Sequence, residues 1–276
     1  NELLCRNGEL ITIAWHHTVN FDERGQACGT LSSGQDITQR KQIERLKDEF
    51  ISTVSHELRT PLTSIHGSLR LILGHVFGDI PEKVLELLQV ANNNSERLLT
   101  LINDLLDIQK IEAGMMQFNF APISPTVLLE EAVENNHPYA LQHQIAITLS
   151  IAEENLPAQI EADHDRMLQV MNNLISNAIK FSPSGEKVEV RLGGGAEQIH
   201  IEVNDHGSGI PEHHRERLFD KFTQVDSSDT RQQGGTGLGL SIASIIVEQH
   251  HGSISYHDNP GGGSSFRVTL PVQFTP

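Results

Sequence analysis

The most regular pattern in the chain is a stripe of apolar residues that recur at alternating steps of three and four positions. The stripe consists of Ile51, Val54, Leu58, Leu62, Ile65, Leu69 and Ile72. This spacing predicts a helix whose apolar seam packs against other helices. Ile43, Leu46 and Phe50 continue the seam upstream, so we expect a connecting helix over residues 38–50 that runs into the first helix.

A second apolar stripe has heptad spacing and predicts a partner helix. Its members are Val84, Leu88, Ala91, Ser95, Leu98, Ile102 and Leu105. We expect this helix to run from about Pro81, a favourable first-turn residue, to Glu112, and to close at Gly114. Residues 74–78 would form the turn between the two helices. A single pair of helices cannot hide two such stripes, so we expect dimerisation into a four-helix bundle.

After residue 115 the pattern changes to alternating strands and helices. The expected strands are 118–123, 145–151, 187–192, 199–204, 253–257 and 265–271, and the expected helices include 125–142 and 167–182. This order predicts an α/β sandwich with one mixed sheet and helices on one face. Residues 1–36 read as strands with a turn at 22–25. The predicted fold class is therefore multidomain α and α+β, with a β fragment at the N-terminus.

His56 lies in the first predicted helix but not on its apolar seam. At about 100° per residue it points roughly 160° away from both Val54 and Leu58, so we expect its imidazole to face solvent. A lone histidine on a helix is most often a surface residue with no chemical task. Here Glu57 is the neighbouring residue and can accept a ring proton or orient the ring. The hydroxyl of Thr60 lies one turn later on the same face.

The run from Phe50 to Leu62, which reads Phe-Ile-Ser-Thr-Val-Ser-His-Glu-Leu-Arg-Thr-Pro-Leu, resembles the phosphoacceptor box of sensor histidine kinases. The resemblance implies that His56 is phosphorylated, that Glu57 assists the transfer, and that Thr60 helps to remove phosphate from a partner. The implied partner is a response-regulator receiver domain, whose aspartate takes the phosphoryl group from the histidine.

A polar set on the helix predicted over residues 167–182 is suited to a metal ion and phosphate. Asn173 and Asn177 lie one turn apart and point the same way. Amide oxygens suit Mg²⁺, and Lys180 can meet phosphate charge as a point cation. Asparagines on an exposed helix are common, so this set needs support from elsewhere in the chain.

Two further motifs supply that support. Asp205 ends a predicted strand and is followed by Gly207 and Gly209; its carboxylate can accept a hydrogen bond from the exocyclic amine of adenine, which guanine lacks at that place. An Asp/Gly turn with no ligand is the alternative for this segment alone. The glycine-rich run over residues 234–240 opens an apolar helix, where backbone amides and the helix dipole favour phosphates. A Rossmann loop would need a strand before it, but a polar run precedes this one.

These motifs, with Leu-Phe-Asp-Lys-Phe at residues 218–222, resemble the four nucleotide boxes of the GHKL ATP-binding superfamily in its kinase branch, whose ATP-binding domain is a Bergerat-type sandwich. The resemblance implies ATP and Mg²⁺ as ligands. It assigns to them the residues Asn173 and Asn177 (metal), Lys180 (phosphates), Phe181 (pocket wall), Asp205, Gly207 and Gly209 (base), and Gly235, Gly237 and Gly239 (phosphate loop). Phe219 and Phe222 would lie on a short helix and anchor a lid over residues 223–235.

Two rival functions remain open from the sequence. The superfamily also contains gyrase-like and chaperone-like ATPases, which need a glutamate one turn before the magnesium asparagine to activate water. This chain has Asn173 at that position, so bound ATP should be protected until a better nucleophile, His56, arrives. The second rival is a non-catalytic scaffold that signals by binding alone, although every polar group that the chemistry needs is present.

The resemblance also divides the chain into parts. Residues 1–37 resemble the last strands of a PAS sensor domain and its exit motif, residues 38–49 would be a signalling helix, residues 50–114 the dimerisation and histidine phosphotransfer domain, and residues 115–276 the catalytic ATP-binding domain. The implied function is autophosphorylation of a homodimer on His56, phosphotransfer to a response regulator, and phosphatase activity toward that regulator.

Composition narrows the classes of partner. The net charge of -16 and pI of about 5.3 argue against a nucleic-acid surface, which needs excess Lys and Arg. The two cysteines match no metal spacing, and we expect reduced thiols in a cytoplasmic protein. No apolar run reaches the ~18 residues of a membrane helix, so we expect no membrane contact by this segment, although a parent protein could be anchored through other segments.

Overall fold

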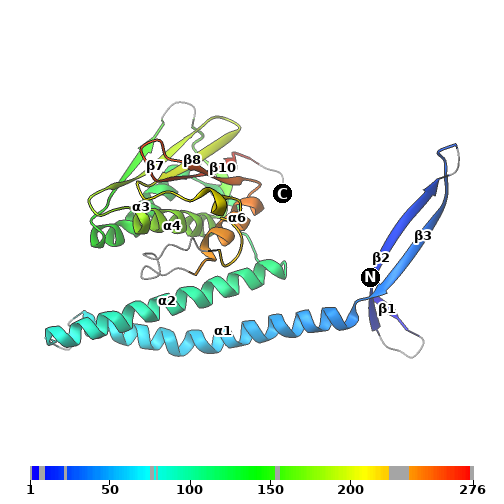
Figure 1. Cartoon of the computed structure of the whole chain (residues 1–276), viewed down its shortest axis with the longest axis horizontal. Coiled ribbons are helices and arrows are strands. Elements are labelled where there is room, and N and C mark those ends of the chain that lie inside the picture. The colour runs from blue at the N-terminus through cyan, green and yellow to red at the C-terminus, as the bar shows by residue number, and fades with distance from the viewer. Residues whose placement is uncertain are drawn as a thin grey trace. The chain divides into compact units, whose positions relative to one another are not determined.

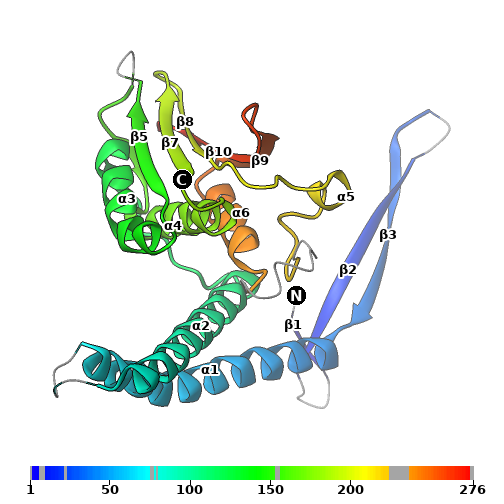
Figure 2. The ribbon, with the colours of Figure 1, turned by 60° about the vertical axis from the view of Figure 1, so that its left-hand side comes forward.

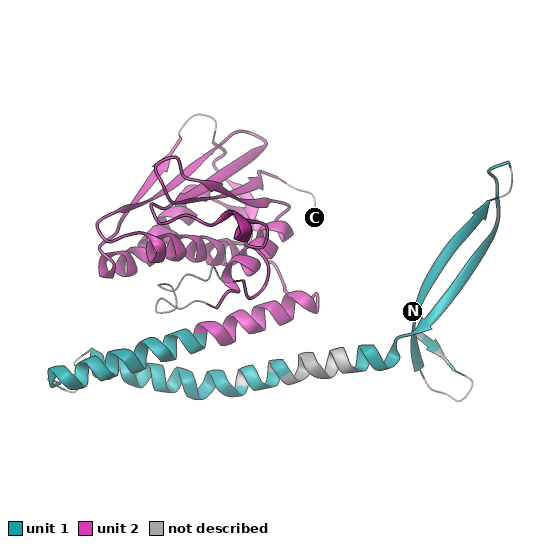
Figure 3. Cartoon of the chain, in the orientation of Figure 1, with its two compact units in different colours: residues 1–99 teal, residues 100–276 magenta. Residues whose placement is uncertain are grey.

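The computed structural model describes residues 2–5, 10–21, 24–74, 78, 80–152, 156–223 and 236–273. It divides into two compact units, Asn1–Leu99 and Thr100–Pro276, shown in Figure 3. The division falls inside the helix α2 (Glu82–Glu112), so the last turns of α2 belong to the second unit. Each unit is described by itself.

The first unit begins with a three-stranded antiparallel sheet of order β1-β2-β3. Its strands are β1 (Glu2–Leu4), β2 (Leu10–Phe21) and β3 (Ala27–Asp36). The strands expected at the N-terminus are thus confirmed. Half of the expected turn, residues 22–23, lies outside the described residues.

The helix α1 (Thr38–Leu73) follows the sheet and continues for 36 residues, with Pro61 inside it. The expected connecting helix and the helix of His56 are therefore one element. At about 1.5 Å per residue it is roughly 54 Å long. The expected second helix is also confirmed, because α2 begins directly after Pro81. Of the turn expected at 74–78, residues 75–77 lie outside the described part.

Within the first unit, α1 and α2 bury only part of their apolar seams. Leu62 is 9% exposed, and the ring of His66 on α1 lies 3.2 Å from the hydroxyl of Ser95 on α2. In contrast, Val54 is 37% exposed and Ile65 is 53% exposed. Each of the two helices can cover only part of the apolar surface of the other, so the remaining apolar positions stay exposed in the single chain.

The second unit contains a mixed five-stranded sheet of order β5-β7-β8-β10-β9, in which β5 and β7 are parallel and the other neighbours are antiparallel. Its strands are β5 (Ala146–Ile151), β7 (Lys187–Gly194), β8 (Gln198–Asn204), β9 (Ser253–Asp258) and β10 (Ser264–Pro271). The helices α3 (Pro125–Gln142), α4 (His164–Phe181) and α6 (Gly239–Gln249) lie on one face of it (Figures 1 and 2). The predicted α/β sandwich is confirmed.

The local sequence explains where the two long helices of this unit begin. Ser124 accepts a hydrogen bond from the amide of Val127 and is followed by Pro125, so α3 has a capped start with proline in its first turn. Asp163 caps α4 by accepting from the amide of Arg166 at 3.0 Å. The predicted apolar face of α4 is buried throughout: Met167, Val170, Met171, Leu174, Ile175 and Ala178.

Three local predictions were wrong. The strand expected from residue 118 begins only at Ala121 as β4 (Ala121–Ile123), and it pairs with an unexpected strand, β6 (Ile160–Ala162). The short helix in this region is α5 (Glu212–Arg215), so Phe219 and Phe222 follow it in turns. Phe222 has a φ of 62° and is 66% exposed, so it does not pack as expected, whereas Phe219 lies against the core.

Candidate functional site

The two predicted magnesium ligands lie side by side on α4. The side-chain amide of Asn177 donates to Oδ1 of Asn173 at 3.0 Å. This bond uses the nitrogen of Asn177, so its Oδ1 stays available as an oxygen ligand. Both side chains are partly exposed, while the opposite face of α4 is buried. Hard amide oxygens at the edge of a rigid helix suit a Mg²⁺ ion that keeps part of its water shell.

The start of α6 lies directly against this asparagine pair. A Cβ added to Gly239, the first residue of α6, would lie 1.9 Å from Nδ2 of Asn173, so Asn173 would have to move from its present position. The glycine therefore lets the N-terminus of α6 approach the amide side chains of α4. Backbone amides at a helix N-terminus, with the dipole of the helix, favour the binding of phosphate groups.

The predicted adenine reader, Asp205, is held firmly at the end of β8. It is 4% exposed, and its Oδ1 accepts from the amides of Gly207 at 2.8 Å and Ser264 at 2.9 Å. Burial raises the pKa of Asp205, although these hydrogen bonds oppose the shift. With Oδ1 engaged, Oδ2 is the atom that can accept from an exocyclic amine.

Glycine is required beside Asp205 because another part of α4 comes close. A Cβ on Gly207 would lie 2.5 Å from the carbonyl oxygen of Phe181, the last residue of α4. The glycine thereby brings the asparagine helix and the aspartate loop together. Gly209 has a φ of 71°, a conformation that glycine adopts readily.

The sequence reasoning missed the residues that hold Asp205 from the β9–β10 loop. The side chain of Asn259 donates to the carbonyl oxygen of Asp205 at 2.8 Å, and the amide of Asp205 donates to the carbonyl of Ser264. A Cβ on Gly263 would lie 2.2 Å from the carbonyl oxygen of Asp205. The only sequence signal was a glycine-rich turn between two strands, which reads as an ordinary hairpin loop.

The structure gives fewer contacts for the other predicted nucleotide residues. The ammonium group of Lys180 lies 4.8 Å from the ring centre of Phe181, which is 44% exposed. Gly237 has a φ of 70° just before α6. Gly235 and the rest of the expected lid, apart from Thr223, lie outside the described residues. Lys180 and Phe181 lie at the end of α4, Gly237 lies two residues before the glycine that approaches Asn173, and Gly235 is not placed.

The predicted phosphoacceptor lies in the other unit. The backbone of His56 is part of α1, and its side chain lies outside what the structure describes. The preceding side chain, Ser55, is buried at 2% exposure, while Glu57 and Thr60 are exposed. The structure thus places the nucleotide-site residues that it describes in one unit and the three phosphotransfer residues on a helix of the other.

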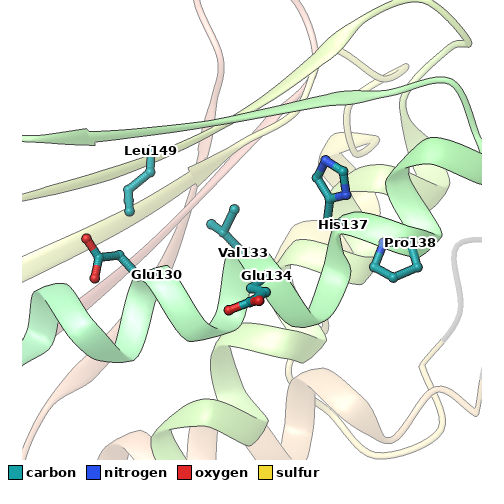
Figure 4. Close-up of a pocket in the computed structure, with 6 residues that line it drawn as sticks. All are labelled: Glu130, Val133, Glu134, His137, Pro138 and Leu149. Carbon is teal, nitrogen blue, oxygen red and sulfur yellow. The ribbon is translucent and has the colours of Figure 1, made fainter.

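A cavity of about 530 Å³ lies away from these motifs, between α3 and β5 (Figure 4). In it Val133 from α3 faces Leu149 from β5, and none of the predicted site residues lines it. Within the described residues, no group of three or more His, Cys, Asp or Glu side chains could hold a metal ion.

This combination of an asparagine helix, a buried aspartate and a glycine-opened helix on one mixed sheet defines an ATP-binding domain of the GHKL class. Two protein-family models match the chain. They are the His Kinase A (phospho-acceptor) domain over residues 46–114 and the Histidine kinase-, DNA gyrase B-, and HSP90-like ATPase over residues 162–273. The chain is a member of the histidine kinase family.

Curated relatives agree with this assignment. The circadian input-output histidine kinase CikA of Synechococcus elongatus is 38% identical over 227 residues, which cover 82% of this chain and 30% of that protein. Sensor histidine kinase WalK of Bacillus subtilis is 34% identical over 275 residues, which cover 97% of this chain and 44% of that protein. The chain thus spans less than half the length of either relative.

One solved structure of a relative has a similar fold. The crystal structure of full-length ShkA in complex with AMPPNP matches with a TM-score of 0.65 and 27% identity, over 83% of this chain and 47% of that one. Among the helices of the described ranges, none combines the length and the hydropathy that crossing a bilayer requires.

Proposed function

We propose that this segment is the catalytic part of a sensor histidine kinase, which transfers the γ-phosphoryl group of ATP to His56 and then to an aspartate of a response-regulator receiver domain. The observation that carries the proposal is the convergence of Asn173, Asn177 and Gly239 with the buried Asp205 in one unit, on the same chain as the histidine motif. The complex of the related ShkA with AMPPNP supports ATP as the nucleotide.

In the proposed site, Asp205 selects adenine through its amine, Gly207 and Gly209 shape the loop around the base, and Phe181 forms a wall of the pocket. Asn173 and Asn177 would hold Mg²⁺, which when bound neutralises phosphate charge. Lys180 and the amides around Gly235, Gly237 and Gly239 would bind the phosphates. Most of the rate would come from positioning, as is usual for phosphoryl transfer.

The proposed transfer starts from a neutral imidazole. One ring nitrogen of His56 uses its lone pair to form a bond to the γ-phosphorus, the bond from that phosphorus to the bridging oxygen breaks, and ADP leaves with the electron pair. The positive charge that develops on the ring is relieved when the other nitrogen gives its proton to Glu57. The phosphoryl group then passes to the carboxylate of the receiver domain.

A second activity, hydrolysis of the phosphorylated receiver, would use Thr60. Its side chain is exposed one turn after His56, where its hydroxyl could hold a water molecule toward a docked partner. The ATPase alternative is weaker, because Asn173 stands where such enzymes need a glutamate to activate water. An amide cannot act as that base.

We also propose that the first unit forms a homodimer with a four-helix bundle. The support is the apolar surface that α1 and α2 leave uncovered in a single chain, including Leu58 at 48% exposure. Because ATP is the substrate, we expect the segment to act in the cytoplasm. The proposed domain limits are those given for residues 1–37, 38–49, 50–114 and 115–276.

The N-terminal strands are proposed to be the end of a PAS sensor domain that controls α1. Oδ1 of Asp36 accepts from both the amide of Thr38, at 2.9 Å, and its hydroxyl, at 2.6 Å, while the amide of Thr12 donates to that hydroxyl oxygen at 2.8 Å. The hydrogen bond from the Thr38 hydroxyl lowers the pKa of Asp36. Strand β2 is thus tied to the first residue of the helix that carries His56.

The test is incubation of the parent chain with γ-labelled ATP and Mg²⁺, beside the variant His56→Gln. Protein-bound label that is acid-labile, alkali-stable and absent from the variant is the expected result. Steady ATP turnover without bound label would instead indicate the ATPase. Binding of ATP with neither product would indicate the non-catalytic scaffold.

A further inference from the structure

The last turns of α2 are built into the ATP-binding unit. Ile108 is 4% exposed and belongs to the same apolar core as the buried face of α4. Beside it, Asp107 accepts from the side-chain amide of Gln169 at 2.8 Å and lies 3.6 Å from the guanidinium of Arg166. Burial of Ile108 in this core, together with the polar contacts of Asp107 with α4, therefore holds this part of α2 in the second unit.

Asp104, one turn earlier on α2, reaches the start of α6 through a single hydroxyl. The hydroxyl of Thr236 donates to Oδ2 of Asp104 at 2.8 Å. The same hydroxyl oxygen, Oγ1 of Thr236, accepts from the amide of Leu238 at 3.1 Å. Leu238 occupies the N-cap position of α6 and directly precedes Gly239, which lies against Asn173. The first amide at the phosphate end of the proposed site is thus already engaged.

The charge of Asp104 opposes a phosphate at the same place. Burial raises its pKa, the hydrogen bond from Thr236 opposes that shift, and the nearby charge of Asp107 adds to it. An ionised carboxylate at a helix start is favourable for the helix itself. It repels a triphosphate that would use the same amides, and partial burial weakens the screening of that repulsion by water.

We propose that Asp104 is a further specificity-determining residue of the nucleotide site, which holds Thr236 over the amide of Leu238 at the start of α6 and disfavours a triphosphate until this contact is released. The inference rests on the proposed function, since it takes the start of α6 as the phosphate site. Because α2 continues into the first unit, a change in α2 would alter ATP affinity. ATP would affect α2 in return, because such coupling is reciprocal.

The test measures binding of a non-hydrolysable ATP analogue and of ADP to the whole chain by calorimetry. Asp104→Asn keeps the size of the side chain and removes its charge. We expect it to tighten binding of the ATP analogue by about tenfold, the usual scale for loss of one charged hydrogen bond, and to affect ADP less. Thr236→Ser keeps the hydroxyl and should bind like the parent.

The matched control is Glu112→Gln. This variant removes one negative charge from the same helix. In the parent, Oε1 of Glu112 accepts from the ammonium group of Lys221 at 2.6 Å, so Glu112 also connects α2 to the rest of the second unit, but not through Thr236. We expect little change in affinity for this variant. An equal gain from Glu112→Gln would mean that general charge, and not the Asp104–Thr236 contact, controls binding, and would overturn the proposal.

A double-mutant cycle with Thr236→Val completes the test. If Asp104 acts partly by holding Thr236, the gain in affinity from Asp104→Asn is smaller in the Thr236→Val background than in the parent, and the part that remains is the effect of its charge alone. A full gain in that background, or no gain from Asp104→Asn in the parent, would contradict the proposal while leaving the kinase function intact. Failure of the parent itself to bind ATP would remove the proposed function, and this inference with it.

Discussion

Gly239 and Asn173 lie so close together that a single added carbon on the glycine would lie 1.9 Å from the asparagine amide. The two residues come from different motifs, one at the start of α6 and the other in the middle of α4. Their contact joins the proposed metal ligands to the proposed phosphate site. The absence of a side chain at residue 239 is therefore a geometric requirement of the site.

Replacing this glycine should disrupt nucleotide binding. In Gly239→Ala the new methyl group must displace Asn173 or the start of α6, so we expect ATP affinity to fall by about tenfold or more, with a modest loss of stability. Titration with a fluorescent ATP analogue and a thermal melt measure the two effects. Gly195→Ala is the control, because a Cβ there meets nothing within 4 Å. ATP affinity like that of the parent in Gly239→Ala would contradict the arrangement.

Replacing Asp205 should weaken the selection of adenine. Asp205→Asn keeps the shape but presents a weaker acceptor and an added donor to the exocyclic amine. We expect ATP affinity to fall by about ten- to a hundredfold, and the preference for ATP over GTP to shrink by a similar factor. Competition between the two nucleotides measures the preference, with the exposed Asp165→Asn as control. An unchanged ratio would remove Asp205 from the role of base reader.

Acid should destabilise the ATP-binding unit through His250. Its ring accepts from the amide of Asp163 at 2.9 Å and lies 2.7 Å from the carbonyl of Ile246. Burial lowers the pKa of His250 below its usual 6.5, and the charge of His251 adds to this, while Ile246 and Asp163 oppose it. The unfolded chain then binds a proton more readily, so the free energy of unfolding should fall as pH drops below about 6.5.

The comparison that isolates His250 is with His250→Gln, which keeps one acceptor and one donor but does not titrate. The difference in unfolding free energy between parent and variant should change by up to about 1.4 kcal/mol per pH unit below about pH 6.5, and be constant above it. Chemical denaturation at several pH values measures it. Parallel pH profiles for both proteins would show that His250 does not contribute.

The uncovered seam of the helices predicts the oligomeric state. Ile65 on α1 and Leu98 on α2 are 53% and 45% exposed in the single chain. Replacing either with Glu should raise the dissociation constant of the proposed dimer by about tenfold or more, because each buried aliphatic side chain contributes about 1.5–3 kcal/mol. Light scattering across a dilution series gives this constant. Thr63→Glu, at an exposed polar position, should leave the dimer intact.

Much of the fold could be predicted because single segments carry their own signals. The bounds of α3 agree with the prediction, since Ser124 and Pro125 mark its start. The three-residue strand β6 could not be predicted, because it is too short for an alternating pattern. Phe222 looked like a packing residue from its spacing, but a positive φ turns its backbone out of any helix.

The site shows the same limit more clearly. Asn173, Asn177 and Asp205 could be identified because their chemistry is visible in short motifs. Asn259 lies 54 residues after Asp205 and Thr236 lies 132 residues after Asp104, so no local pattern connects either pair. These contacts depend on how the elements pack, which the spacing of residues along the chain does not reveal.

The position of Ile108 in the second unit determines where a fragment that contains the ATP-binding unit should begin. A fragment that begins at Met115, after α2 has ended, would lack Ile108 and leave its place in the apolar core open to water. Such a fragment would also lose Asp104, and its nucleotide affinity would not represent that of the intact chain. A fragment that begins near Thr100 retains the last turns of α2 together with the rest of the second unit.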